Sequence, residues 1–324
     1  MKAAVVFKKG EMSKYTEDFA APKQPEENEL LISVKAAAVK NLDKMQASGK
    51  HYSTENETFT AKIVGGDGVG VLADGTRVYG IGKNGMIAEQ AIIDKNMVVK
   101  LPDQLDDASA AALPNAVMGS AMALLFKANM QAGETVLING ATGVTGRIAV
   151  QIAKHYGAKK IIATGRNEQS LKELLSLGAD DIISLQDNEE SFISQIKKIH
   201  HETPINIVID YLWGQAAEMI LTALKGKGMF TTPTSFITVG GMINDKITLS
   251  SSILRSTNLQ ISGSGIGSWT KDEINLLIKE ILPEMFQLAA DGKLKIETLT
   301  IPLQEVERAW TMNIDSGKRL VITI

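Results

Sequence analysis

The feature that most constrains the fold is a regular alternation of two sequence patterns that begins after Gly133. Short apolar runs typical of buried strands are separated by longer segments with apolar residues at helical spacing. Alternation of this kind produces parallel strands joined by crossover helices. The second half of the chain therefore predicts an α/β domain with a doubly wound parallel sheet, whose strands are expected at 135–138, 160–163, 181–184, 205–210 and 228–232.

A turn that contains two glycines follows the first of these strands and opens a helical pattern over 147–156. The turn consists of Ala141, Thr142, Gly143, Val144, Thr145 and Gly146. Its glycines allow a pyrophosphate to approach the backbone and the helix to pack closely on the strand, and the N–H groups at a helix start attract phosphate. Alanine takes the first position of the usual G-x-G-x-x-G, so the pattern gains its specificity from its place between a strand and a helix. It predicts a dinucleotide-binding Rossmann domain; the alternative is a purely structural turn.

The residues that follow the second predicted strand bear on which dinucleotide binds. This strand ends in Thr164, Gly165 and Arg166. A site for NAD usually carries Asp or Glu here to bind the ribose hydroxyls, whereas a site for the 2′-phosphate of NADP supplies arginine. No acidic residue is present between 160 and 167. We therefore expect NADPH as the cofactor, with these three residues in its site; the alternative is that Arg166 is a solvated loop residue.

The first hundred residues follow a different pattern, of short β-rich segments broken by glycine. These segments lie at 30–39, 62–71, 77–81 and 86–93, and Asp74-Gly75 is a turn signal between two of them. They predict a compact, partly antiparallel β domain. In the alanine-rich stretch 106–130 that follows, Pro114 predicts a break between two consecutive helices.

The C-terminal segment combines one helical pattern with further strands. Apolar residues at helical spacing over 274–285 predict an amphipathic helix, with Thr270 and Glu273 as its capping box. Strands are expected at 298–301 and 319–324. Because they come after a complete nucleotide domain, we expect them to complete the first domain. The resulting division assigns 1–117 and 262–324 to a β-rich catalytic domain and 118–261 to the nucleotide-binding domain.

Composition excludes several kinds of partner and site. A length of 324 residues favours two domains over one core. The chain contains no cysteine, so disulfides, thiolate catalysis and sulfur-bound zinc are excluded. The net charge of −3 comes from interspersed acidic and basic residues, so nucleic acid is not an expected partner. No apolar run approaches the ~20 residues of a membrane helix and no export signal is present, so we expect a soluble, cytoplasmic protein without a membrane partner.

Several motifs along nearly the whole chain resemble those of one enzyme family. Val39 to Asp43 resembles V-N-P-x-D, and residues 65–70 stand where zinc alcohol dehydrogenases have G-H-E-G-x-G. Further matches are Ser48-Gly49 with Tyr52, 74–78, 110–114, 139–146, 177–180, 254–256 and 317–321. On these residues the chain resembles the zinc-less quinone oxidoreductase branch of the medium-chain dehydrogenase/reductase superfamily.

The resemblance has implications for architecture and for the cofactor site. It implies a GroES-like catalytic domain made of both chain ends around a central Rossmann domain, with a small-molecule substrate in the cleft between them. It also implies a homodimer joined through the Rossmann sheets. By the same resemblance, Ser262, Gly263 and Ser264 are expected to contact the nicotinamide amide of the cofactor.

The sequence departs from the family pattern near the expected substrate. Lys40 and Asn41 replace the Asn and Pro of V-N-P-x-D, and Met45 replaces a tyrosine. Gly119 stands where a threonine is commonly found near the nicotinamide, and Gly66 stands where a zinc-ligating histidine would fall. These departures concern the catalytic residues rather than the fold.

A reductase without zinc needs an acceptor that carries its own negative charge. Metal-dependent alcohol dehydrogenases stabilise an alkoxide with a Lewis acid. Hydride addition to a quinone gives a phenolate-like oxygen with a pKa of about 10, against about 15.7 for an oxygen that resembles water. The gap of roughly six pKa units corresponds to about 8 kcal/mol. The sequence therefore favours quinones and α,β-unsaturated carbonyls as acceptors.

Asn41 and Tyr52 are the predicted hydrogen-bond donors to the acceptor, because both lie in the segment that resembles the family's substrate-facing loop. Asn41 is equally consistent with an N-cap for a helix over 42–47, and Tyr52 with packing at a rim. Asp67 either orients these groups or belongs to a tight turn, and Asn115 is a candidate for the cleft wall. The predicted function is an NADPH-dependent reductase of quinones or enones. The alternatives are a specific enal or enoyl reductase and a catalytically silent nucleotide-binding sensor or structural protein.

Overall fold

The computed structural model describes residues 1–48 and 60–324. This part of the chain forms two compact units, which we call the terminal unit (Met1–Asn115 with Leu276–Ile324) and the central unit (Ala116–Asn275). The expected divisions lie at 117/118 and 261/262. The second division falls later in the structure, after Asn275, and strand β14 (Leu259–Gly263) pairs within the sheet of the central unit.

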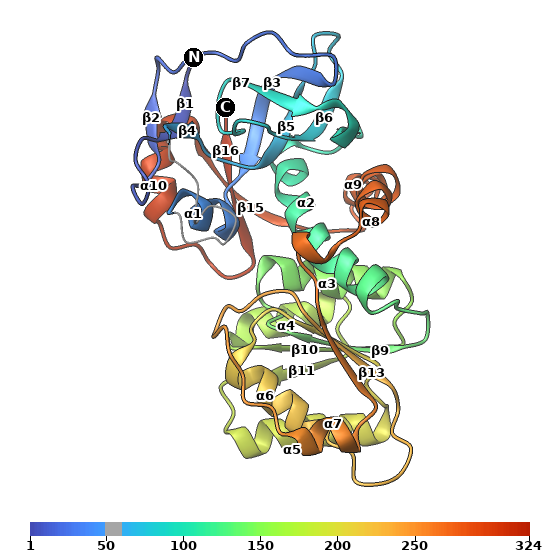
Figure 1. Cartoon of the computed structure of the whole chain (residues 1–324). Helices are drawn as coiled ribbons and strands as arrows, with labels where there is room; N and C mark the ends of the chain where they lie inside the picture. Colours follow the sequence, from blue (N-terminus) through green and yellow to red (C-terminus); the bar gives the residue numbers. More distant parts are fainter. Residues whose placement is uncertain (49–59) are drawn as a thin grey trace. The chain divides into compact units, whose positions relative to one another are not determined.

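The central unit contains a six-stranded sheet in which the paired strands are parallel. The strand order is β11-β10-β9-β12-β13-β14, with β9 at Thr135–Asn139, β10 at Lys160–Gly165, β11 at Asp181–Ser184, β12 at Ile207–Asp210 and β13 at Thr234–Thr238. Helices α3 (Val144–His155) and α4 (Glu168–Leu177) lie on one face of the sheet, and α5 (Glu189–Glu202), α6 (Gly214–Ala223) and α7 (Ser251–Ser256) lie on the other (Figure 1). The predicted doubly wound α/β fold is confirmed.

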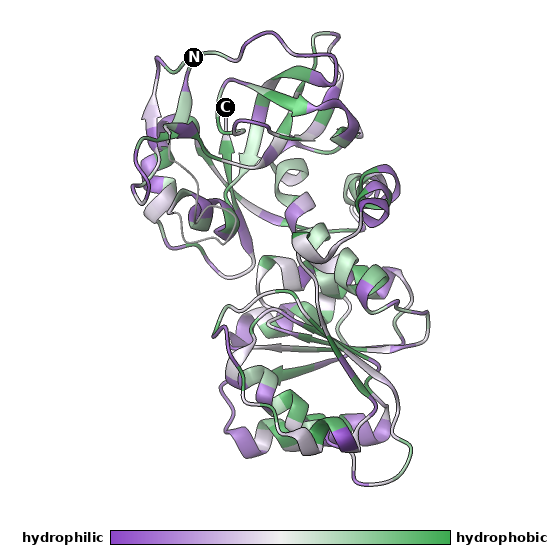
Figure 2. Cartoon of the chain, viewed as in Figure 1, coloured by the Kyte–Doolittle hydropathy of each residue, from purple (hydrophilic) through white to green (hydrophobic). Residues whose placement is uncertain are grey.

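Burial explains why these segments form strands. β9 is buried along its whole length, as expected for a parallel strand with helices on both faces of its sheet. Leu137, Ile162 and Val208 come from three adjacent strands and share one core cluster with Phe192 of α5 and Ile220 of α6. Figure 2 shows the hydrophobic residues gathered on the strands of this sheet and polar residues on the outer sides of its helices.

One strand of this sheet lies further along the chain than the sequence predicts. The expected strand 228–232 is irregular in the structure, and β13 begins two residues after it, at Thr234. Thr234 is buried, whereas the Phe230 side chain is 96% exposed and its backbone is left-handed (φ 66°). The local apolar pattern imitates a strand, but pairing with β12 selects the residues that follow it.

The terminal unit is built from two sheets. One has the strand order β2-β1-β4, and the other has the order β15-β16-β3-β5-β6-β8, with β7 paired to β3. The strands are β1 (Ala3–Val6), β2 (Lys14–Thr16), β3 (Glu29–Ala38), β4 (Lys62–Ile63), β5 (Asp67–Val71), β6 (Arg77–Ile81), β7 (Gln90–Asp94), β8 (Val99–Lys100), β15 (Glu297–Pro302) and β16 (Lys318–Thr323). Because β16 pairs with β3, the C-terminal strands complete a sheet that the N-terminal strands begin, as predicted.

The alanine-rich segment forms one helix instead of the two that were expected. α2 (Asp107–Ala121) passes through Pro114, and the π-helical turn η3 (Met122–Lys127) continues it. A proline inside a helix costs about 3 kcal/mol, and the burial of residues 110–113 offsets this cost. The combined span of 21 residues reaches a mean hydropathy of 1.4 and is long enough to cross a membrane, contrary to the expectation from the sequence. Since 67% of its apolar window is buried inside the protein, it has the character of a core helix.

The amphipathic helix expected near the C-terminus is confirmed, together with its first turn. α8 (Lys271–Leu276), the π-helical turn η5 (Leu277–Ile281) and α9 (Leu282–Ala290) follow one another directly. The Thr270 N–H donates to the Glu273 carboxylate (2.6 Å), and the Glu273 N–H donates to the Thr270 hydroxyl (3.1 Å), so the capping box forms. α10 (Val306–Thr311) is the helix between β15 and β16.

Candidate active site

The order of the strands in the central unit reverses beside β9, which produces a topological switch point at the carboxyl edge of its sheet; in sheets of this kind a crevice is expected there. From β9 the chain adds β10 and β11 on one side, and then adds β12, β13 and β14 on the other side. In a sheet of this order the connections that follow the two central strands diverge, and ligands bind between them. The predicted glycine turn follows β9 and therefore lies at this crevice.

Three glycines of the predicted site differ in what surrounds them. A Cβ atom at Gly146 would lie 2.5 Å from the Ala141 Cα, so only glycine allows α3 to pack this closely on the turn. A Cβ atom at Gly165 would lie 2.4 Å from the Thr142 Cγ2. At Gly143 the nearest described atom would be 3.7 Å from the added Cβ, which is an ordinary contact. The packing therefore requires glycine at 146, where the close atoms belong to the backbone, and a side chain at 165 would require Thr142 to move, whereas a Cβ at 143 would be accommodated.

The first turn of α3 is suited to phosphate. Its N-cap is Gly143, in extended conformation (φ −73°, ψ 164°), and no side chain of the described residues caps it. The N–H groups at the start of a helix have no partner within the helix and carry the positive end of its dipole. Val144 and Thr145 open this helix of 12 residues, so the predicted turn presents N–H donors to the crevice.

Arg166 lies directly beyond the carboxyl end of β10 and is exposed. Its carbonyl oxygen accepts a hydrogen bond from the Gln186 side chain (2.7 Å), which holds its backbone. The next residue, Asn167, caps α4 by accepting a hydrogen bond from the Ser170 N–H (2.8 Å). The Arg166 side chain is thus presented at the same edge of the sheet as the glycine turn.

The other predicted cofactor residues differ in how accessible they are. Thr164 is fully buried at the end of β10, so its hydroxyl bonds within the protein. Ser262 and Gly263 are the last residues of β14, and Ser264 follows them. Ser264 is 4% exposed, and its hydroxyl accepts a hydrogen bond from the Trp269 indole N–H (3.1 Å). The Ser264 side chain is therefore largely enclosed within the protein.

Gly119, where the family commonly has threonine, lies beside the glycine turn. A Cβ atom at this position would lie 2.8 Å from the Thr145 Cγ2. The methyl group of Thr145 therefore fills the space that a side chain at 119 would need, which explains in physical terms why glycine stands here.

In the terminal unit, Asn41 is the first residue of α1 (Asn41–Ala47) and is exposed. Lys40 precedes the helix, and its N–H donates to the Asp43 carboxylate (2.8 Å). The alternative in which Asn41 caps this helix is therefore wrong. Tyr52, the other predicted donor, lies outside the described residues.

A buried group of charges lies beside α1, and we call it the Lys40 cluster. The Lys40 ammonium forms ion pairs with Asp67 of β5 and with Asp43, whose Oδ2 is 3.6 Å from Nζ. The Tyr79 hydroxyl donates to Asp67 Oδ2 (2.8 Å), and the Gly66 N–H donates to Asp43 Oδ1 (3.1 Å). Asp67 is 6% exposed and belongs to a strand, so the alternative of a tight turn at this position is wrong.

Burial and charge pairing act in opposite directions in the Lys40 cluster. Burial by itself would lower the pKa of Lys40, but attraction to Asp43 and Asp67 outweighs it and raises the pKa above its ordinary value. Burial raises the pKa of Asp43, and the Lys40 charge opposes this effect. Burial and the Asp67 carboxylate raise the pKa of Tyr79 well above its ordinary value. At neutral pH, Lys40 is therefore a cation and Tyr79 a hydrogen-bond donor.

The residues at this position do not fit a zinc site. The sequence has no cysteine, and residue 66 is glycine. Within 1–48 and 60–324, no group of three or more His, Cys, Asp or Glu side chains is arranged to hold a metal ion. The Lys40 ammonium instead supplies the positive charge between Asp43 and Asp67.

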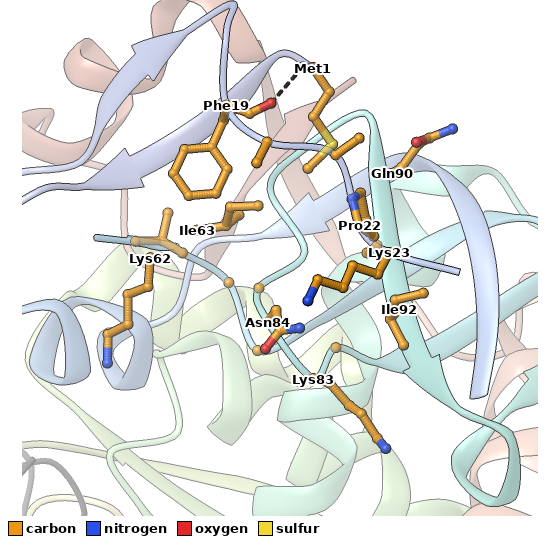
Figure 3. Close-up of a pocket in the computed structure, with 18 of the residues that line it drawn as sticks. Met1, Phe19, Pro22, Lys23, Lys62, Ile63, Lys83, Asn84, Gln90 and Ile92 are labelled. Carbon is orange, nitrogen blue, oxygen red and sulfur yellow. Dashed lines mark hydrogen bonds between the residues drawn. The ribbon is translucent and has the colours of Figure 1, made fainter. Parts of the chain in front are cut away.

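The terminal unit also contains a cavity of about 830 Å³ (Figure 3). Phe19 is part of its apolar wall, and Lys23 and Lys62 are among its polar residues. The cavity also borders Asp43 and Gly66, so it reaches the edge of the Lys40 cluster. The predicted cofactor residues, all of which the structure describes, are absent from its wall, so it is distinct from the glycine turn.

We expect Gly146→Ala to lower the free energy of unfolding of the protein by about 1–3 kcal/mol, because the added methyl group overpacks the contact between α3 and the turn. Gly228→Ala is the matched control, since no atom lies within 4 Å of a Cβ at that position. Denaturant unfolding followed by circular dichroism measures both variants. Equal stability of the two would contradict the close contact.

Lys40→Met is expected to lower the free energy of unfolding by about 3–5 kcal/mol, because it removes the only cation in an ion pair with the buried Asp43 and Asp67 among the described residues and leaves them only the weaker attraction of Arg319. Lys35→Met, on the exposed side of β3, removes the same charge and is expected to change stability by less than about 0.5 kcal/mol. The same denaturant titration measures both. A loss in Lys40→Met no greater than in the control would show that the ion pairs do not stabilise the fold.

Comparisons with known proteins agree with this geometry. Residues 144–282 match the family described as zinc-binding dehydrogenase. The chain is 35% identical over 222 residues to a quinone oxidoreductase of Sus scrofa, in an alignment that covers 65% of this chain and 66% of that protein. It is 30% identical over 268 residues to a quinone oxidoreductase of Pongo abelii, covering 79% of this chain and 80% of that protein.

A solved structure shows the same fold. The quinone oxidoreductase of Thermus thermophilus, described together with its complex with NADPH, superposes with a TM-score of 0.77 at 23% identity, over 100% of both chains. The sheet topology and the glycine turn of this chain, together with the extent of its match to these relatives, all indicate the same family. The chain belongs to the zinc-less quinone oxidoreductase branch of the medium-chain dehydrogenase/reductase superfamily.

Proposed function

We propose that this protein is an NADPH-dependent, zinc-independent reductase that transfers a hydride to quinones or related α,β-unsaturated carbonyl compounds. The observation that carries the proposal is the glycine turn at the carboxyl edge of the central sheet. There Gly146 brings the start of α3 against the turn, and Gly143, the N-cap of α3, has no described side chain capping it and no close contact at the position of a Cβ. This combination is suited to a dinucleotide.

Three groups of residues would hold the cofactor in this proposal. The N–H groups of the turn would bind the pyrophosphate, and Arg166 would bind the 2′-phosphate of the adenosine ribose. The segment Ser262 to Ser264 would contact the nicotinamide amide. The NADPH complex described for the Thermus thermophilus relative supports the choice of cofactor. When bound, NADPH would supply the hydride.

The acceptor class follows from the residues near α1. The Lys40 ammonium, rather than a Lewis-acidic metal, lies between Asp43 and Asp67, and this favours an acceptor that spreads the negative charge of the product over its own conjugated system. Asn41 and Tyr52 are the proposed hydrogen-bond donors to that oxygen. One good donor to a developing oxyanion contributes about 3–4 kcal/mol, which is enough for an oxygen that is already phenolate-like.

The remaining features of the proposal concern the organisation of the protein. The central unit would bind the dinucleotide and the terminal unit would supply the donors, in a cytoplasmic homodimer that acts on a small molecule. The names of the relatives, which are quinone oxidoreductases, support the substrate class.

The experiment that tests the function is NADPH oxidation with a panel of quinones and enones. We expect multiple turnovers with 1,4-naphthoquinone and slower turnover with simple 2-alkenals, because the quinone product is the more stable anion. Preference for an enal or enoyl thioester would favour a specific enoyl reductase. Binding of NADPH without consumption across the panel would favour a silent sensor and contradict catalysis.

Arg166→Glu tests the choice of dinucleotide. The carboxylate repels the 2′-phosphate and accepts hydrogen bonds from ribose hydroxyls, so we expect the Kd for NADPH to rise by about tenfold or more and the preference to move toward NADH. Lys172→Glu, an exposed position on α4, makes the same change of charge away from the end of β10 and serves as the control. An unchanged ratio of NADPH to NADH affinity in Arg166→Glu would contradict the phosphate assignment.

A further inference from the structure

A chain of buried hydrogen bonds joins the carboxyl ends of three neighbouring strands in the central unit. The Gly140 N–H donates to the Thr164 hydroxyl (3.2 Å), and this hydroxyl donates to Asn139 Oδ1 (2.6 Å). The Asn139 side-chain amide then donates to Asp210 Oδ1 (2.7 Å). Thr164, Asn139 and Asp210 are each 0% exposed. The chain therefore connects β10, β9 and β12 at the edge of the sheet where the glycine turn begins.

In this series of hydrogen bonds, every donor points toward Asp210. An ionised carboxylate only accepts hydrogen bonds, so it is suited to the last position of such a chain. Asp210 Oδ1 also accepts from the Leu212 N–H (3.2 Å), and Oδ2 accepts from the Trp213 N–H (3.1 Å). Burial raises the pKa of Asp210, and the hydrogen bonds from Asn139, Leu212 and Trp213 oppose this effect. The carboxylate thus joins the Asn139 side chain to the turn that follows β12.

The turn after β12 is held in a conformation that its sequence does not favour. Trp213 has a positive φ (55°, with ψ −161°), which is uncommon for a residue with a side chain. Its indole packs edge-on against Phe236, with ring centroids 6.1 Å apart. Such a conformation persists only where the surroundings enforce it. Here the Asp210 carboxylate accepts from the Trp213 backbone and enforces it.

The same turn contacts the predicted dinucleotide site at two points. A Cβ atom at Gly140, where φ is +85°, would lie 2.9 Å from the Leu212 side chain, so Leu212 packs directly on the start of the glycine turn. The Tyr211 hydroxyl donates to the Gly119 carbonyl oxygen (3.0 Å), and Gly119 lies beside Thr145. Displacement of the turn after β12 would therefore disturb the start of the glycine turn at Gly140 and the part of α2 that packs against Thr145.

We propose that Asp210 is a positioning residue for the dinucleotide. Through Asn139 and Thr164 it fixes the Gly140 N–H, and through the backbone of residues 212 and 213 it holds Leu212 against the glycine turn. The proposal rests on the proposed function, because it assumes that the glycine turn binds the cofactor. Asp210 acts through other residues, so its effect falls on cofactor affinity rather than on the transfer step.

Asp210→Asn is the variant that tests the proposal. It replaces one acceptor oxygen with an NH₂ donor. Since each oxygen of Asp210 accepts at least one N–H, the substitution places two hydrogen-bond donors opposite each other in one contact. We expect the Kd and the KM for NADPH to rise about tenfold, which is about 1.4 kcal/mol. The kcat at saturating NADPH and the KM for the acceptor should stay within about twofold.

Thr234→Val is the matched control. Thr234 is 2% exposed, and its hydroxyl donates to the Ile205 carbonyl oxygen (2.8 Å) at the opposite, amino edge of the same sheet. Loss of this buried hydrogen bond is expected to lower the Tm and to leave the Kd for NADPH within about twofold of the unaltered protein. A purely structural role of Asp210 would produce the same result in Asp210→Asn as in this control.

The outcomes separate the two proposals. Weaker NADPH binding in Asp210→Asn with unchanged kcat, and unchanged binding in Thr234→Val, supports the positioning role. Binding of NADPH at the unaltered affinity in Asp210→Asn overturns the positioning role and leaves the proposed function intact. If the unaltered protein binds no dinucleotide, both proposals are wrong. Should Asp210→Asn fail to fold, Asn139→Ser interrupts the same series of hydrogen bonds while Asp210 keeps its backbone contacts. The Kd of that variant for NADPH then decides whether the positioning role holds.

Discussion

The account of this protein depends on one close contact, between the start of α3 and the turn that follows β9. Because residue 146 has no side chain, the helix approaches the turn to a distance at which a Cβ atom would lie 2.5 Å from the Ala141 Cα. This contact fixes the direction of the first N–H groups of α3 and therefore the place where a phosphate can bind. The strand order then brings the ends of β10 and β12 to the same edge, so Arg166 and Asp210 lie along it.

Electrostatics in the terminal unit follow a second constraint, which is that buried carboxylates need a neighbouring cation. A metal ion or a lysine can satisfy this need, but only the metal can also act as a Lewis acid on a substrate oxygen. In this chain the Lys40 ammonium pairs with both Asp43 and Asp67 and is itself 4% exposed, and the Arg319 guanidinium adds a second positive charge that attracts them. The Lys40 cation is thus enclosed between the two carboxylates. The proposed conjugated acceptor is consistent with this arrangement, because such an acceptor stabilises its own negative charge.

Much of the fold was predictable from local sequence. The alternation after Gly133, the turn up to Gly146 and the capping box at Thr270 each depend on residues close together in the chain, and the structure has all three. The return of the C-terminal strands to the first unit also followed, because they come after a complete nucleotide domain. Where the predictions were wrong, contacts distant in sequence decided the structure. Pairing with β12 shifted β13 past the apolar residues around Phe230, and burial kept α2 continuous through Pro114.

The site shows the same division between local and distant causes. Glycine spacing predicted which residues form the turn, but it did not distinguish Gly146, which the packing requires, from Gly143, which has room around it. The pairing of Lys40 with Asp67 was not predictable, because the two residues are 27 positions apart and meet only through sheet register. The chain of hydrogen bonds to Asp210 joins residues 71 positions apart in the same way. The roles of Asn41 and Tyr52 remain predictions.

The most direct test of the central claim is a calorimetric titration of the protein with NADPH, made in parallel on Gly143→Ala. A methyl group at 143 meets no described atom closer than 3.7 Å, so the variant should unfold at the same temperature as the unaltered protein. It would occupy the space of the pyrophosphate, and we predict that the Kd for NADPH rises by about tenfold or more. Equal affinity of the two proteins for NADPH would contradict the account, because it would mean that the dinucleotide binds elsewhere.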